Sequence, residues 1–129
     1  MRYVVDTHAL VWYLSNDPRL GLEARRILAE PSTSLIIPTV VLAEAKHISE
    51  RKRTTITFDE IMRTVASARR ITIFPLDIFV VAALPTNLDI HDGLIVATAL
   101  AARDLFAEEV AVLTRDQLIS ASALVPVIW

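Results

Sequence analysis

Short runs of valine, isoleucine and leucine recur along the chain, and they alternate with longer segments in which apolar residues recur at helical spacing. The short runs show no polar alternation, which is typical of strands covered on both faces. This pattern predicts strands at residues 3–5, 35–37, 71–74, 110–113 and 125–128. It predicts helices at residues 9–14, 22–29, 39–49, 58–68, 78–84 and 93–103.

Strands that alternate with helices through short connections are typical of a parallel sheet with helices on both faces. We therefore expect an α/β fold. The chain has 129 residues, which matches one domain at about 100–200 residues per domain, and we expect a single domain over 1–129. Segment 93–103 is apolar almost all round, so it predicts a deeply buried helix.

Four acidic residues follow the predicted strands. Asp6 comes directly after the first strand and Asp116 after the fourth. Glu44 stands among apolar residues in the helix after the second strand, and Asp92 opens the buried helix. Because sites in parallel sheets form past the carboxyl ends of the strands, we expect the four carboxylates to share one pocket.

Such a pocket requires a counter-charge. Two like charges about 4 Å apart repel by about 4 kcal/mol at an effective dielectric near 20, so clustered carboxylates need protons or cations. Arg115 is the only basic neighbour of the four, and oxygen ligands favour Mg²⁺ or Mn²⁺ over zinc. We therefore expect Mg²⁺ (or Mn²⁺) at these acids, where it would act on a phosphate group.

Each acid also has a purely structural interpretation. Asp6 and Asp92 are each suited to cap a helix, and Asp116 is suited to a turn. Glu44 is equally consistent with an exposed helix face. The position of all four at the ends of strands favours a common site over four separate coincidences.

Neighbouring polar residues have smaller roles in this interpretation. Thr7 and Thr114 each adjoin a candidate acid and are auxiliary residues that would orient a carboxylate through the hydroxyl group. His8, His47 and His91 are expected to be satisfied or to face solvent rather than to bind metal.

Composition excludes several other classes. The absence of cysteine rules out disulfides and thiolate sites, and the only two glycines, Gly21 and Gly93, cannot build a glycine-rich phosphate loop. No uncharged run reaches the roughly 18 residues of a membrane span, and the N-terminus lacks the pattern of a secretory signal. We expect a cytoplasmic protein. The net charge of −2 gives no overall sign of nucleic-acid binding.

Four motifs together resemble a known family. They are Val-Val-Asp-Thr-His-Ala-Leu from residue 4, Leu-Ala-Glu from residue 42, His-Asp-Gly-Leu-Ile-Val-Ala-Thr-Ala-Leu from residue 91 and Leu-Thr-Arg-Asp from residue 113. In this order and spacing they resemble the PIN domain, and above all the VapC-like toxin ribonucleases of type II toxin–antitoxin pairs. The resemblance covers essentially the whole chain.

The resemblance implies a three-layer α/β/α sandwich with a central parallel five-stranded sheet. It also implies a Mg²⁺- or Mn²⁺-dependent endoribonuclease that hydrolyses single-stranded RNA in line and leaves a 5′-phosphate. By motif match, Asp6, Glu44 and Asp92 take the positions of an acidic triad and Asp116 that of a fourth acid, with Thr114 beside them. The implied partners are RNA, a cognate antitoxin and a second copy of the chain in a homodimer.

One residue departs from the family pattern. Gly93 stands where arginine or alanine often follows the third acid, so the resemblance implies no substrate contact from that side chain.

A basic cluster at the end of the third helix is a candidate RNA-binding surface. It consists of Lys46, Arg51, Lys52 and Arg53, and it is suited either to contact phosphates or simply to face solvent.

Two other functions remain open at this point. A non-catalytic PIN-like scaffold would bind RNA or protein without cutting, and a phosphatase or phosphotransfer domain is disfavoured because His8 stands where a second Asp is needed and no lysine follows Lys52.

Overall fold

The strands of the computed structural model, which describes residues 1–129, form one parallel sheet in the order β3-β2-β1-β4-β5. They are β1 (Arg2–Val5), β2 (Ser34–Pro38), β3 (Ile71–Phe74), β4 (Val110–Leu113) and β5 (Val127–Ile128). The α/β class and the five parallel strands are confirmed. The last strand begins two residues later than predicted, after Pro126, which has no N–H and joins the ladder only by accepting a bond from the Val112 N–H.

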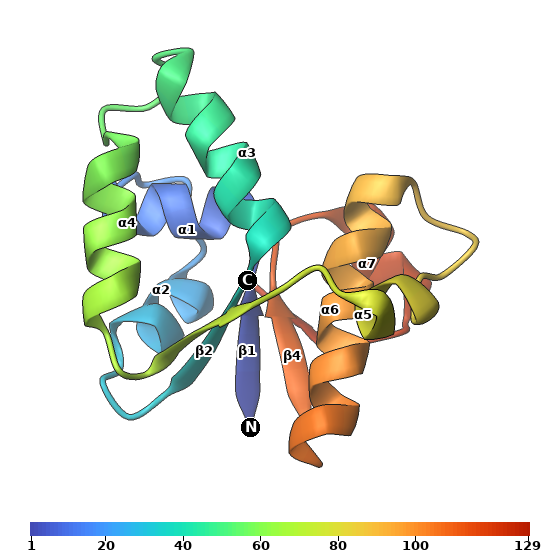
Figure 1. Ribbon diagram of the computed structural model, residues 1–129. Helices are drawn as coiled ribbons and strands as arrows, with labels where there is room; N and C mark the ends of the chain where they lie inside the picture. The colour runs from blue at the N-terminus through green and yellow to red at the C-terminus, as the bar shows by residue number, and fades with distance from the viewer.

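Seven helices cover the two faces of this sheet. They are α1 (Thr7–Leu14), α2 (Leu22–Ala29), α3 (Thr39–Glu50), α4 (Phe58–Ser67), α5 (Ile78–Ala82), α6 (Ile90–Phe106) and α7 (Gln117–Ser122). Helices α1–α4 lie on one side of the strands and α5–α7 on the other (Figure 1). This three-layer arrangement explains why the strand sequences are largely apolar.

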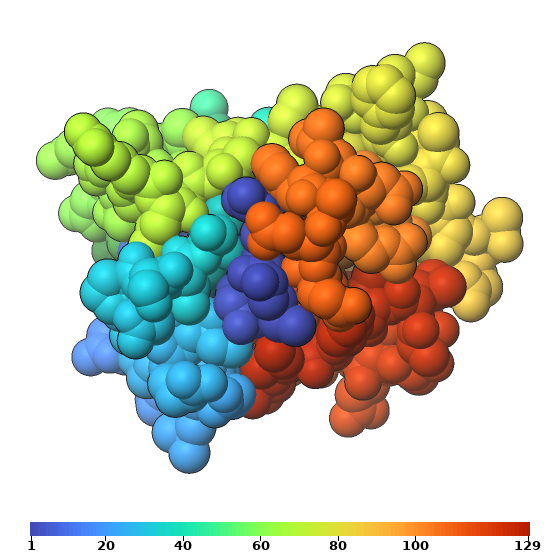
Figure 2. Space-filling view, turned by 90° about the horizontal axis from the view of Figure 1, so that it is seen from below, coloured from blue at the N-terminus to red at the C-terminus, as the bar shows by residue number.

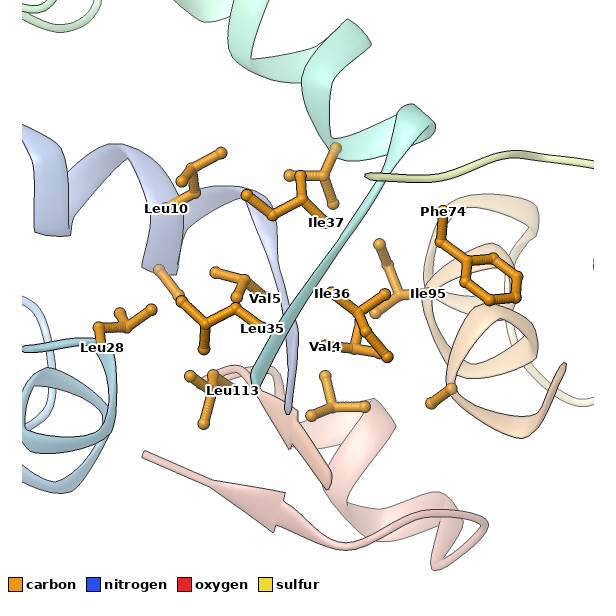
Figure 3. Packing of buried hydrophobic residues seen from close by; sticks show 14 of the residues in the cluster. Val4, Val5, Leu10, Leu28, Leu35, Ile36, Ile37, Phe74, Ile95 and Leu113 are labelled. Carbon is orange, nitrogen blue, oxygen red and sulfur yellow. The ribbon is translucent and has the colours of Figure 1, made fainter. Parts of the chain in front are cut away.

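Alternate strand residues supply the two halves of the core. Val5 and Leu35 point toward α1 and α2, whereas Val4 and Ile36 point toward α6 and its Ile95 (Figure 3). All five side chains are buried. The sheet is therefore held by apolar packing on both faces, and its strand ends are left to carry polar residues.

Side-chain caps shift two helix starts from their predicted positions. Helix α6 begins at Ile90 rather than at residue 93, because the Asp89 carboxylate accepts from the Asp92 N–H and caps the helix. The possibility that Asp92 itself is the cap is therefore wrong. Helix α1 begins at Thr7 rather than residue 9, because Asp6 is its N-cap. The expected deep burial of the α6 segment is confirmed.

The amino end of the sheet is closed by its own contacts. Seen from below, the N-terminus lies between the chain around β2 and the end of α6 (Figure 2). There the Arg2 guanidinium lies 3.9 Å from the centre of the Phe106 ring, and its Nε lies 3.4 Å from Glu108. None of the helices has both the length and the apolar character needed to cross a membrane.

Candidate metal-dependent active site

The strand order reverses direction at β1. Strands β2 and β3 extend the sheet on one side of β1, and β4 and β5 extend it on the other. Ligands of open α/β sheets bind at such a switch point, outside the carboxyl ends of the strands. Asp6 follows β1 and Asp116 follows β4, so two of the four predicted acids lie at this point.

Both of these aspartates cap helices. Asp6 Oδ1 accepts from the Thr7 N–H at 2.7 Å, and Asp116 Oδ1 accepts from the N–H groups of Leu118 and Ile119 at 2.8 and 3.0 Å. The structural interpretation of Asp6 as a cap is therefore correct. A capping carboxylate is still able to bind a cation, because its oxygens have further lone pairs.

Thr114 links the two strand ends. Its hydroxyl donates to Asp6 Oδ2 at 2.5 Å and accepts from the Asp116 N–H at 3.0 Å. The side chain is buried, so these are bonds that water cannot replace. Thr114 thereby fixes the orientation of Asp6 relative to Asp116.

Glu44 reaches the site from α3, which follows β2, whereas Thr114 and Asp116 follow β4 on the other side of β1. The hydroxyl of buried Thr7 donates to Glu44 Oε1. His91 Nε2 lies 2.6 Å from the same oxygen but is not aligned for a hydrogen bond, so this buried nitrogen is close to the carboxylate without a formed bond. His91 Nδ1 lies 3.8 Å from Asp92 Oδ1, which joins Glu44 to Asp92 through the imidazole ring.

Asp92 lies in the electric field of other acidic residues. Burial raises the pKa of the Asp92 carboxyl, and the negative charges of Asp116, Asp89 and Asp6 raise it further, while His91 acts in the opposite direction. Carboxylates from the ends of different strands therefore share one electrostatic environment. Such crowding is costly unless a cation is bound.

The donor chemistry of this region fits a hard divalent cation. Asp6, Glu44, Asp92 and Asp116 offer carboxylate oxygens, the ligand type that Mg²⁺ and Mn²⁺ prefer. A hollow of about 320 Å³ beside Asp6 and Asp116 is also lined by His8, Thr114 and Arg115. No three Asp, Glu or His side chains form a ready metal-binding group, so binding would draw the acids closer together.

A larger groove adjoins this hollow. It measures about 980 Å³ and is lined by α1, by α3 and by the loops that follow these helices. Glu44 lies on it, and His8 lines both the groove and the hollow. The structure separates the predicted basic cluster: Lys52 and Arg53 line the groove, whereas Lys46 and Arg51 do not.

Comparison with known proteins bears on this arrangement. A family model described as the PIN domain matches residues 3–123. The chain belongs to the PIN domain family. Members of this family are generally nucleases, and a strand-end cluster of carboxylates suits that chemistry.

A solved structure has the same fold as this PIN domain. It is described as the crystal structure of VapBC2 from Rickettsia felis bound to a DNA fragment from their promoter. The match has a TM-score of 0.67 and covers 99% of this chain and 98% of the other, at 15% sequence identity. This likeness concerns the fold. The comparison with curated proteins found no match.

Sequence analysis did not anticipate the position of His91. This residue was expected to be satisfied or to face solvent, but its Nε2 is buried against Glu44. Its place directly before Asp92 was the available signal, because a helix that presents Asp92 at its first turn also holds residue 91 near the site.

The sequence also gave no indication of the arginines around Trp12. The guanidinium of Arg19 lies 4.6 Å and that of Arg115 4.5 Å from the centre of this buried indole ring. Arg19 lines the groove and Arg115 the hollow. Cations are therefore held on both sides of the boundary between the two depressions.

Proposed function

We propose that this PIN domain is a Mg²⁺- or Mn²⁺-dependent endoribonuclease that hydrolyses phosphodiester bonds in single-stranded RNA. The observation that carries the proposal is the hollow at the switch point of the sheet, where Thr114 joins Asp6 to Asp116 by hydrogen bonds. The pKa of the Asp92 carboxyl, raised by burial and by nearby carboxylates, agrees with this placement. Family membership supports the nuclease chemistry.

In this proposal Asp6, Glu44, Asp92 and Asp116 hold the divalent cation. A cation bound there would neutralise the phosphodiester and lower the pKa of the attacking water. The protein's own contribution is to position the ligands. Thr114 orients Asp6 and Thr7 orients Glu44 through buried hydroxyl bonds. Of the predicted basic cluster, Lys52 and Arg53 line the groove and would supply contacts to the flanking phosphates.

The proposal extends to partners. The structural neighbour is a VapBC complex, which supports the assignment of this chain as the toxin of a type II toxin–antitoxin pair with a cognate antitoxin protein. Exposed apolar side chains on α5 and α6 support a homodimer, because such side chains are usually covered by a partner. The protein would act in the cytoplasm, where RNA substrates are available.

The decisive variant is Asp6→Asn. Asparagine keeps the oxygen that caps α1, so the fold should persist, but it removes the charge that holds the cation. Cleavage of a single-stranded RNA oligonucleotide in Mg²⁺ or Mn²⁺ should fall by at least about a hundredfold. Asp77→Asn is the matched control, because Asp77 caps α5 and lines neither the hollow nor the groove.

Two results would count against this assignment. Unchanged cleavage by Asp6→Asn would remove Asp6 from the site. Calorimetric titration of Mn²⁺ near neutral pH distinguishes the nuclease from a non-catalytic PIN-like scaffold, since a scaffold would bind no Mn²⁺ at these acids.

A further inference from the structure

The groove beside the acidic hollow is lined by residues from separate segments of the chain. His8 and Trp12 come from α1, Glu44 and His47 from α3, and Lys52 and Arg53 from the segment directly after α3. Its volume of about 980 Å³ is at the upper end of the range of roughly 300–1,000 Å³ for ligand sites in proteins. The groove therefore has room for an extended ligand rather than for a single ion.

The groove leads to the carboxylates. His8 is exposed and lines both depressions, and Glu44 lies on the groove while touching His91, the neighbour of Asp92. A strand whose phosphate is held by a cation at Asp6 and Asp116 would reach the groove by passing His8. This continuity makes the groove a path to the site rather than a separate pocket.

Two of its cations are free to bind anions. The exposed side chains of Lys52 and Arg53 form no ion pair and no hydrogen bond within the protein. Arg19, on the facing wall, is already held by Asp17 through bonds of 3.0 and 2.8 Å. The uncompensated positive charge of the groove therefore lies at Lys52 and Arg53.

The other basic residues at the end of α3 are placed differently. Lys46 Nζ lies 3.7 Å from Glu50 and 5.5 Å from the centre of the Phe58 ring, and Lys46 does not line the groove. Arg51 is exposed but does not line the groove. These two residues carry the same charge in the same part of the chain, so they are a built-in control.

Aromatic and cationic groups mark the boundary between groove and hollow. His8 and Trp12 lie 5.1 Å apart between ring centres, and Arg115 lies over Trp12 on the hollow side without an ion pair of its own. Proteins that bind single strands combine cations along the backbone with aromatic rings beside the bases. His8 is the exposed ring of this pair, because Trp12 is only 4% exposed.

We propose that this groove binds the single-stranded RNA that flanks the cleaved bond, with Lys52 and Arg53 contacting its phosphates and His8 stacking against a base where the strand enters the acidic hollow. This inference rests on the proposed ribonuclease function and assigns the route of its substrate. An acidic protein segment is the alternative occupant, but the continuity of the groove with the carboxylates at His8 and Glu44 favours a phosphate chain.

The test measures binding without cleavage. Fluorescence anisotropy of a labelled single-stranded RNA oligonucleotide of mixed sequence is recorded in EDTA, over about 50–200 mM salt. The variant Lys52→Asn/Arg53→Gln removes both cations, and asparagine tolerates the left-handed backbone of Lys52, whose φ is 54°. The control is Lys46→Gln/Arg51→Gln, which removes the same charge outside the groove.

The groove variant should bind RNA about tenfold more weakly or worse, and the slope of log affinity against log salt should shrink by about 1.4 for two lost phosphate contacts. The control should change affinity by less than about twofold. Equal loss in both variants, or loss in neither, would overturn the proposal. So would loss of binding to a labelled polyglutamate peptide with RNA binding unchanged.

The outcome is independent of the nuclease assignment. Asp6→Asn leaves the groove intact and removes a negative charge beside the RNA path, so in this metal-free assay it should bind RNA at least as tightly as the wild type. If Asp6→Asn still cleaves RNA while the groove variant fails to bind it, the metal site is wrong and the groove stands. If Asp6→Asn is inactive and the groove variant binds as wild type, the groove is wrong and the metal site stands.

Discussion

Two buried threonines each hold one acidic side chain in place. Thr114 and Thr7 are each at most 2% exposed, and each donates its hydroxyl proton to a carboxylate from another segment of the chain. A buried hydroxyl survives only where its hydrogen bond is made, so each threonine specifies where its carboxylate must lie. The geometry of the site depends on these bonds as much as on the acids themselves.

Replacing Thr114 with valine keeps its shape and removes both bonds. The Asp116 N–H and Asp6 Oδ2 lose their partner, which should cost about 1–3 kcal/mol of unfolding free energy. RNA cleavage should fall by roughly 10–100-fold, as when an orienting group is removed from a metal ligand. Thr98→Val is the control, since its hydroxyl bonds only within α6, to the Leu94 carbonyl. Equal activity of the two variants would deny Thr114 a positioning role, and Thr114→Ser should restore activity.

Asp92 should have a measurable effect on metal-free stability. Its pKa is raised by burial and by nearby carboxylates, so its ionised form destabilises the fold at pH values above the folded-state pKa. Asp92→Asn should therefore raise the melting temperature in EDTA at pH 7. The gain should shrink as the pH falls toward 3.8, the ordinary pKa of an aspartate, where the unfolded chain also binds the proton. Thermal melts at pH 7, 5 and 4 test this, and a gain independent of pH would contradict it.

The first residues of three helices position the acidic side chains of the site. Asp6 follows β1 directly and Asp116 lies three residues after β4, so each residue starts a helix just past a strand and lines the hollow. Asp89 caps α6 and sets Asp92 in its first turn. The residues that cap these helices therefore also set the geometry of the site.

The two glycines should respond to alanine in opposite directions. A Cβ at Gly21 would lie 2.4 Å from the backbone carbonyl carbon of Trp129, so Gly21→Ala must displace the chain after β5 and should cost roughly 1–3 kcal/mol. A Cβ at Gly93 would meet Leu84 at 3.4 Å and Pro85 at 3.8 Å, which is ordinary van der Waals contact, and replacing a helical glycine with alanine stabilises by up to about 1 kcal/mol. Urea unfolding of both variants measures this. A destabilised Gly93→Ala variant would show that the start of α6 has no room for a side chain at residue 93.

The whole molecule has one conspicuous exposed apolar surface. The α5 patch, defined as Ile78, Phe79, Val81 and Leu105, lies on α5 and α6, and its side chains are 53–75% exposed. This surface lies on the opposite side of the sheet from α1–α4 (Figure 1). A second copy of the chain bound there would leave the groove beside α1 and α3 open to RNA.

Light scattering tests this dimer directly. The wild-type protein should have twice the 14.3 kDa mass of the chain, and Phe79→Asp should have the monomer mass, because a buried unpaired carboxylate opposes the interface. Leu22→Asp is the control, since Leu22 is 87% exposed outside the patch. A dimer that survives Phe79→Asp but not Leu22→Asp would relocate the interface.

The sequence by itself determined the local features of this protein. Apolar runs specified the strands, and helical spacing specified six of the seven helices but missed α7. The positions of Asp6 and Asp116 after strands followed from the same pattern, because these are properties of neighbouring residues. Only the tertiary structure decided how distant segments meet. It placed β1 beside β4, joined Thr114 to Asp6 across 108 positions of sequence, set His91 against Glu44 and divided the basic cluster between groove and solvent. These arrangements depend on the packing of helices against both faces of the sheet, and no single stretch of sequence contains that information.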